Sequence, residues 1–221
     1  MKQKTLKVFS LLCVVIFPMF VFVGCSSDND KEINDTTNEQ GLAYYLQDDE
    51  TYAVSIGNAI HLSSITIPDK YLNKKVSKIE DFANANFSAI KLGRYVTKIC
   101  AKAFSGCKNI KSIEIPRRVT YIGGDVFRGC DNLTNMNFLG TLDEWVLITF
   151  VNAYSNPTSC TGKLIINKEE ITNAIVTSVF VRDYAFYNCK NLISITVCDY
   201  TSIVNSAFSY CTELKTVRSV I

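Results

Sequence analysis

The chain has 221 residues, of which 48% are hydrophobic and 20% are charged, and this composition excludes an intrinsically disordered protein. Its formal net charge is +2, but three lysines lie in the first 24 residues, and the remainder has 20 basic and 21 acidic side chains. Because nucleic-acid binding requires an excess of positive charge, nucleic acid is not expected as a partner.

Residues 1–24 have the features of an export signal. Three lysines precede a 16-residue apolar run, 8–23, which is shorter than the roughly 20 residues of a membrane-spanning helix. The run ends at Gly24-Cys25, which resembles the cleavage site of bacterial lipoproteins. We therefore expect Cys25 to be lipidated and to anchor the protein in the outer membrane, at the cell surface or facing the periplasm. An ordinary secretory signal with an unmodified Cys25 is the alternative.

The next segment, 25–40, is expected to be an acidic tether, because its residues after Cys25 include five acids, one lysine and almost no apolar side chains. Its start resembles the surface-export signal of lipoproteins from the Bacteroides group, although acidity for solubility alone is the other interpretation. Residues 41–67 contain three β-like runs without the repeat pattern described below. They are expected to form an N-terminal β cap, because the first coil of a solenoid would otherwise expose its apolar core.

The central feature of the chain is a repeated unit of 23 residues. Two near-copies follow each other, ICAKAFSGCKNIKSIEIPRRVTY (99–121) and IGGDVFRGCDNLTNMNF (122–138). The repeat consists of an apolar-x-apolar strand, a Val-x-x-Ile turn, which joins these two copies at Val119 and Ile122, and a helix-like segment with a phenylalanine. One such unit cannot bury its own apolar face and must stack on a neighbour, which is typical of a solenoid.

Repeats are assigned to residues 65–139 and 177–221, and no C-terminal cap is evident. The unit between residues 79 and 99 is interpreted as degenerate, because Phe82 and Phe87 lie out of register.

An insert occupies residues 140–176. It opens with Thr141-x-x-Glu144, which predicts a capping box and a short helix. A later run predicts a hairpin that turns at Asn167-Lys168.

Several strings resemble BspA-type leucine-rich repeats, which occur in surface proteins of Bacteroides and related bacteria. SIEIPRRVTYIGGDVFRGCDNL and VRDYAFYNCKNLISITV resemble the repeat, EWVLITFVNAYSNP an insert of that family, and GLAYYLQDDETYAVS its cap. The resemblance covers about residues 41–221. It implies a leucine-rich-repeat solenoid, α/β or mostly β: a right-handed coil with a curved parallel sheet of short strands and short helical or 3-10 segments opposite. For the better-known members it implies adhesion to host proteins or other cells.

Phenylalanine and cysteine recur three positions apart in the repeats. The expected structural ladder consists of Phe104, Phe127, Phe186 and Phe208 with Cys107, Cys130, Cys189 and Cys211. Stacking places neighbouring cysteines about 4.8 Å apart, and we favour buried thiols over disulfides, which an exported protein permits. Cys160 and Cys198 lie outside this register. No CxxC or CxxH pair occurs, so no metal site is expected.

An enzyme is not expected, and neither is a cofactor. The single histidine, His61, lies in the presumed cap. The chain contains no GxSxG, P-loop or HExxH string that would supply a nucleophile, a phosphate cradle or a catalytic zinc.

The candidate binding residues are those that alternate with the apolar positions of each strand and therefore point outward. They are Lys91, Ser112, Glu114, Asn135, Asn137, Ser194, Thr196, Thr216 and Arg218. A host or cell-surface protein or glycan is the expected partner, although a merely soluble face is an equal alternative. Trp145, with Phe150 and Tyr154, is a further candidate as a sugar platform, against the alternative that these rings fill the core. The other functional hypothesis is an envelope protein whose C-terminal coil docks a partner or a second copy.

Overall fold

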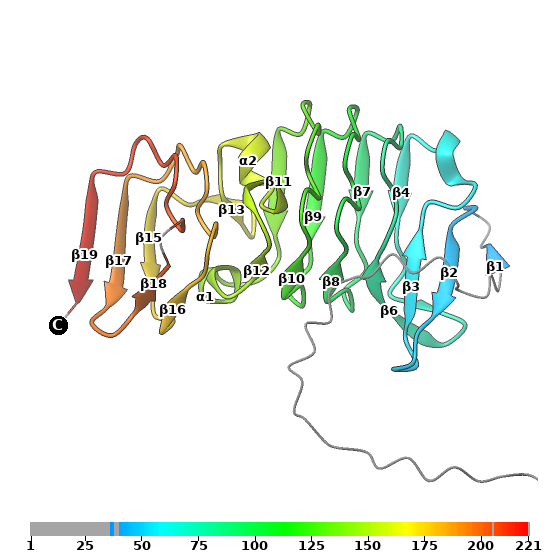
Figure 1. Ribbon diagram of the computed structural model, residues 1–221, viewed down its shortest axis with the longest axis horizontal. Helices are drawn as coiled ribbons and strands as arrows, with labels where there is room; N and C mark the ends of the chain where they lie inside the picture. The colour runs from blue at the N-terminus through cyan, green and yellow to red at the C-terminus, as the bar shows by residue number, and fades with distance from the viewer. Residues whose placement is uncertain (1–35, 38–39, 205, 221) are drawn as a thin grey trace, which may run out of the picture.

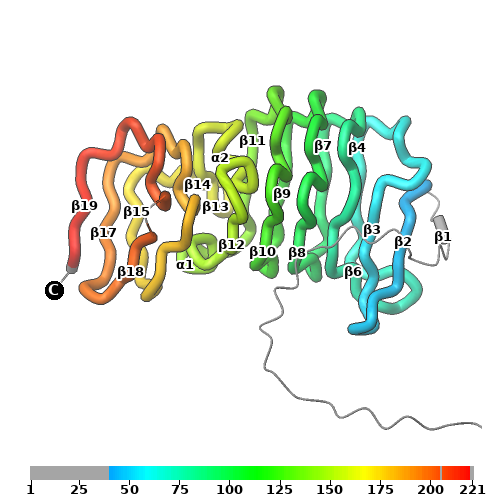
Figure 2. The backbone as a smooth tube through the Cα atoms, in the orientation of Figure 1, coloured from blue at the N-terminus to red at the C-terminus, as the bar shows by residue number. Residues whose placement is uncertain are grey.

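The computed structural model describes residues 36–37, 40–204 and 206–220, and every structural statement below refers to these. The expected export signal, Cys25 and most of the acidic tether lie outside the described residues. Figures 1 and 2 show a solenoid of about seven turns, whose coils are stacked along the long axis of the molecule.

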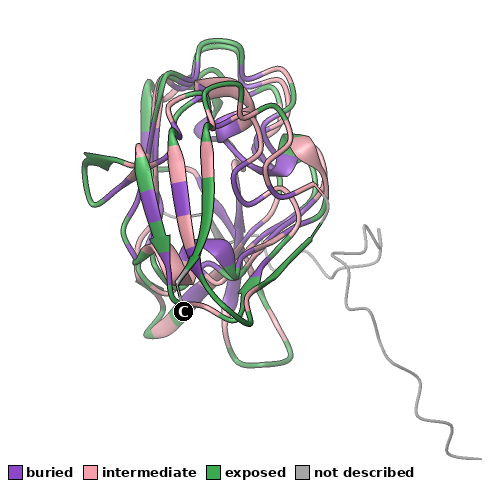
Figure 3. Ribbon diagram, turned by 90° about the vertical axis from the view of Figure 1, so that its left-hand side faces the viewer, coloured by how far each residue is buried: buried purple, intermediate pink, exposed green. Residues whose placement is uncertain are grey.

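One strand of each coil joins a parallel sheet made of two panels. The N-terminal panel is formed by β4 (Ser64–Thr66), β7 (Ala89–Lys91), β9 (Ser112–Ile115), β11 (Asn135–Phe138) and β13 (Ile165–Ile166), with antiparallel β14 (Glu169–Glu170) at its edge. The C-terminal panel is formed by β15 (Asn173–Val176), β17 (Ser194–Cys198) and β19 (Thr216–Val220). Apolar side chains alternate inward along these strands, and Figure 3 shows the resulting alternation of buried and exposed positions.

A second row of short parallel strands begins at the predicted β-like run around residue 54 and continues where the sequence predicted Val-x-x-Ile turns. It contains β3 (Tyr52–Ser55), β6 (Lys74–Ile79), β8 (Lys98–Ile99), β10 (Tyr121–Ile122) and β12 (Thr149–Phe150), and further along the chain β16 (Phe180–Val181) and β18 (Ser202–Ile203). The isoleucine that ends each Val-x-x-Ile motif is buried between neighbouring coils, as at Ile99 and Ile122. Backbone groups beside it then bond to the next coil, which makes each of these turns a strand.

The segments that carry the repeat phenylalanine are runs of turns, and the expected helical or 3-10 conformation is not adopted. Lys102 and Asp125 have positive φ angles of 60° and 58°, which no right-handed helix accommodates. Backbone groups of these segments bond to the next coil. Lys102 N–H donates to the carbonyl of Gly124 at 2.8 Å, and Gly106 N–H donates to the carbonyl of Arg128 at 2.8 Å. Stacking thus satisfies the backbone groups that a helix would satisfy within itself.

The coil between residues 79 and 99 is in register with its neighbours, so its interpretation as degenerate was wrong. Phe82 and Phe87 are both fully buried. Phe82 N–H donates to Ala103 O at 2.8 Å, and the Cys107 thiol donates to Phe82 O at 3.1 Å. Phe82 therefore occupies the repeat phenylalanine position, and Ala85 stands where other coils have cysteine. The coil is three residues shorter than the next, because Ile79 and Ile99 are 20 residues apart and Ile99 and Ile122 are 23 apart.

The cysteines form the predicted packing ladder as thiols. All seven described cysteines are free. Three ladder thiols donate to the carbonyl of a phenylalanine one coil earlier: Cys107 to Phe82 and Cys130 to Phe104, both at 3.1 Å, and Cys211 to Phe186 at 2.8 Å. Cys160 belongs to this ladder, since its thiol donates to Phe127 O at 3.3 Å. Its place was not visible in the sequence, because the insert changes the spacing from phenylalanine to cysteine.

The N-terminal end is closed by an antiparallel unit of β1 (Thr36–Thr37), β2 (Ala43–Leu46) and β3, followed by the 3-10 turn η1 (Ala59–His61). The third β-like run of the expected cap contains β4, which is already a strand of the N-terminal panel. A short hairpin that the sequence did not predict joins β5 (Lys70–Tyr71) to β6. It places Tyr71 on Tyr44, with ring centroids 3.9 Å apart.

The insert contains α1 (Leu142–Val146), η2 (Ala153–Ser155) and α2 (Thr158–Thr161). The capping box of Thr141 and Glu144 is present, and β13 and β14 form the hairpin that turns at Asn167-Lys168. β15, which the sequence placed inside the insert, pairs in parallel with β17 and so belongs to the coil stack. No helix among the described residues is long and apolar enough to cross a membrane.

Candidate binding surface

The outward side chains of the N-terminal panel form two columns across neighbouring strands. The strand register aligns Lys91 with Glu114 and Glu114 with Asn137. In the same way Ser112 aligns with Asn135. The Lys91 and Glu114 side chains make no hydrogen bond or ion pair within the described part of the chain, and the charge that acts on Lys91 is that of Asp69, so both charges are available to a partner.

A shallow hollow of about 420 Å³ lies on this panel. Its lining includes Ser112, Glu114, Asn135, Asn137 and Lys168. The hairpin β13–β14 supplies Lys168, whose backbone N–H donates to Asn137 Oδ1 at 2.8 Å. Asn137 Nδ2 is buried and has no hydrogen-bond partner among the described residues. A buried amide without a partner is costly and is a common feature of functional sites.

The remaining sheet candidates lie on the C-terminal panel, apart from this hollow. Ser194 aligns with Thr216, and Thr196 with Arg218. No strand pairing joins the two panels within the described residues, because the β13–β14 hairpin ends the first before β15 begins the second. The sequence predicted one polar strip, whereas the structure divides it into two surfaces.

Trp145 is not a surface residue. It is fully buried, its Nε1–H donates to the Ala185 carbonyl at 2.7 Å, and its ring centroid lies 5.2 Å from that of Phe150, which is also buried. Of the three rings considered as a platform, Tyr154 alone is exposed, at 43%. Trp145 therefore connects the insert to the next coil, and the core alternative is the one the structure adopts.

The described C-terminal coil exposes positions that are buried in the coils before it. Val217 aligns with Ile195, yet Val217 is 57% exposed while Ile195 is fully buried. Phe208 stacks on Phe186 at 5.1 Å and is only partly buried. Self-association or partner docking at this end would bury these side chains.

The described residues hold no group of three or more histidine, cysteine or acidic side chains arranged to bind a metal ion. His61 lies exposed in η1, away from the hollow.

Stacked coils with a parallel sheet and connecting turns define a leucine-rich-repeat-type β-solenoid. The model of the BspA-type leucine-rich repeat region matches residues 54–180 and 168–219 in six copies, and the chain therefore belongs to this family. Such repeat proteins are of a bacterial surface type and generally bind other proteins, and their solenoid fold is typically non-catalytic.

Two solved structures are similar to this chain. A leucine-rich-repeat protein of T. pallidum is 17% identical, with a TM-score of 0.51, and the match covers 82% of this chain and 81% of that one. A leucine-rich cell surface protein from Faecalibacterium prausnitzii A2-165 is 20% identical, with a TM-score of 0.39. That match covers 80% of this chain and 38% of the other, so this chain spans well under half of its length. No curated protein matches the chain.

Proposed function

We propose that this protein is a non-catalytic adhesion module that captures another protein through the N-terminal panel. The observation that carries the proposal is the row formed by Lys91, Glu114 and Asn137 beside the hollow. Two unpaired charges of opposite sign and a buried, unsatisfied amide stand on adjacent strands. Such a row suits a protein surface with complementary charges, because paired polar groups set the register and specificity of an interface.

Reversal of the central charge is expected to weaken partner binding strongly. Glu114→Lys should lower the affinity of captured proteins by about 10-fold to 1000-fold, because it leaves an unpaired or repelled charge at the interface. Candidate binders are obtained by screening a displayed library of extracellular protein domains against the intact protein, and their affinities are measured by surface plasmon resonance.

Glu213→Lys is the matched control, because Glu213 is exposed on a turn outside both panels. The double change Lys91→Glu with Glu114→Lys should weaken binding further than Glu114→Lys alone, because it sets like charges against the partner at both positions. Binders that are equally tight to wild type and to Glu114→Lys would show that the N-terminal panel is not the binding surface.

The location proposed for this function is the outer cell surface, with lipid on Cys25 as the anchor. In the native host, protease added to intact cells should degrade the wild-type protein, and Cys25→Ser should release it to soluble fractions. Wild-type protein that stays intact until the outer membrane is opened would contradict surface adhesion. If the Cys25→Ser protein stays in the membrane fraction, the lipid anchor at Cys25 is contradicted, whereas surface adhesion is not.

A further inference from the structure

Four tyrosines from consecutive coils gather outside the two sheets, on the turn segments. This tyrosine cluster consists of Tyr154, Tyr184, Tyr187 and Tyr210. The ring centroids of Tyr184 and Tyr187 are 5.9 Å apart, and those of Tyr187 and Tyr210 are 5.3 Å apart. The Arg128 guanidinium lies over the Tyr154 ring at 4.3 Å. Burial and then the neighbouring phenols of Tyr210, Tyr154 and Tyr184 raise the pKa of Tyr187.

The tyrosine cluster is not needed to cover the hydrophobic core. Phe186 and Phe208 already stack beneath these turns at 5.1 Å. Tyr210 is 68% exposed and Tyr154 is 43% exposed. Tyr184 and Tyr187 are half-buried. Tyrosine is amphipathic and is enriched at binding surfaces, so two exposed rings beside two half-buried ones suit a ligand.

The backbone at Tyr210 gives independent evidence. Its φ angle is +63°, in the left-handed region that bulky side chains disfavour. The equivalent turn position in earlier coils holds glycine or asparagine, the residues that adopt this conformation most easily: Asn84, Gly106, Gly129 and Asn188. The positive φ belongs to the turn of the repeat, and the aromatic side chain is what distinguishes Tyr210, so packing of the turn does not require an aromatic residue there.

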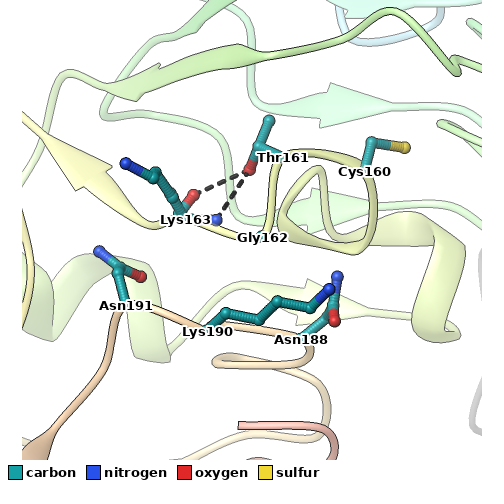
Figure 4. Close-up of a pocket in the computed structure, with 7 residues that line it drawn as sticks. All are labelled: Cys160, Thr161, Gly162, Lys163, Asn188, Lys190 and Asn191. Atoms are coloured by element: carbon teal, nitrogen blue, oxygen red, sulfur yellow. Dashed lines mark hydrogen bonds between the residues drawn. The ribbon is translucent and has the colours of Figure 1, made fainter. Parts of the chain in front are cut away.

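A polar hollow of about 270 Å³ begins at the residue after Tyr187 (Figure 4). Asn188 and Lys190 line it from one coil, and Thr161 and Lys163 line it from the insert. Asn188 Nδ2 donates to the carbonyls of two α2 residues at 3.1 Å, which leaves its Oδ1 as an acceptor. The Lys190 ammonium makes no ion pair within the described residues.

We propose that the tyrosine cluster and this hollow form a second binding site, for an oligosaccharide. Pyranose rings have an apolar C–H face that stacks on aromatic rings, while their hydroxyls need donors and acceptors at the edge. The rings of Tyr187 and Tyr210 supply the stacking surface, and Lys190 and Asn188 supply the polar groups. The site differs in position and in ligand class from the N-terminal panel.

The test is retention on a printed array of defined oligosaccharides, followed by calorimetric titration of the best-retained sugar with the intact protein. Tyr187→Ala and Tyr210→Gly should each weaken binding by about 10-fold or more. Tyr210→Gly installs the residue type that two other coils carry at this position, so the fold should tolerate it, and thermal melting checks this. Tyr200→Ala is the matched control, because Tyr200 is 92% exposed and lies in the turn after β17.

The proposal is overturned if no oligosaccharide is retained by the wild-type protein, or if the retained sugar binds Tyr187→Ala and Tyr210→Gly as tightly as wild type. Glu114→Lys separates this site from the proposed adhesion surface, because it should leave sugar affinity unchanged. Sugar binding that is lost in Glu114→Lys and kept in both tyrosine variants would place the sugar on the N-terminal panel and contradict the proposal.

Discussion

Replacement of Trp145 by alanine is expected to lower the free energy of unfolding by about 3–5 kcal/mol. Trp145 is the largest fully buried side chain of the described residues, and its ring contacts both Phe138 and Phe150, with centroids 5.3 and 5.2 Å away. The substitution leaves a cavity and also removes the donor to Ala185 O. Chemical denaturation monitored by circular dichroism measures the loss.

Trp145→Ala should affect more than the cavity that it creates, because Trp145 links the insert to the coil that follows. Ala185 O accepts from Trp145 Nε1 at 2.7 Å and from Asn156 Nδ2 at 3.1 Å. In a repeat protein, stability depends on the contacts between neighbouring units, so a weak junction uncouples the units on either side. The loss expected for Trp145→Ala therefore includes weakened coupling between the insert and the coil that follows it.

Two variants make the Trp145 result interpretable. Trp145→Phe keeps most of the ring and loses only the donor, so its loss should be smaller than that of Trp145→Ala. Tyr154→Ala removes an exposed aromatic residue of the same insert and should cost little. A loss below about 1 kcal/mol for Trp145→Ala would contradict the assignment of Trp145 to the core.

Raising the pH from 8 to about 10.5 is expected to reduce the free energy of unfolding by about 4–6 kcal/mol through the cysteine ladder. Burial raises the pKa of Cys107 and of Cys211 from 9.0 to about 11, and that of Cys130 to about 12. Between pH 9 and pH 11 the folded chain therefore keeps thiol protons that the unfolded chain has lost. Stability falls as the pH rises through this window, by about 1.4 kcal/mol per pH unit for each cysteine. Below pH 8 both states are protonated and the ladder contributes no pH dependence.

Alanine is the control substitution for these cysteines, because Ala85 already occupies the cysteine position of an earlier coil. The double variant Cys107→Ala with Cys130→Ala should fold and should show a shallower decline of stability with pH. The buried Tyr44, whose pKa burial raises to about 12, acts in the same direction and is unchanged in this variant. Equal slopes for the variant and the wild type, measured by denaturation from pH 8 to 10.5, would exclude the ladder as the cause.

The sequence could predict those features that depend on local order or on a fixed repeat distance. Strands with alternating burial, the ladder of Phe104 and Phe127 with their cysteines, and the capping box at Thr141 all follow from side chains a few residues apart. Each of these repeat residues contacts the equivalent residue of the next unit, so the repeat length alone is sufficient to infer which residues stack.

Where the period is broken, only the tertiary structure decided the outcome. Phe82 looked out of register because it follows Ile79 by three residues, whereas Phe104 follows Ile99 by five. Stacking nevertheless aligns Phe82 with Phe104 through cross-coil hydrogen bonds. The insert likewise concealed that Cys160 completes the ladder and that Trp145 reaches Ala185, 40 residues later in the chain.

For the two proposed binding surfaces, too, part was predictable from the sequence and part was decided by the tertiary structure. Alternation within β9 and β11 determined that Ser112, Glu114, Asn135 and Asn137 face outward, because side chains along a strand point to opposite sides. The division of that face into two panels and the meeting of Tyr154, Tyr187 and Tyr210 were decided by the fold. Tyr187 and Tyr210 lie one repeat period of 23 residues apart, but Tyr154 belongs to the insert, 33 residues before Tyr187, so its place near them is decided by the stacking of the coils.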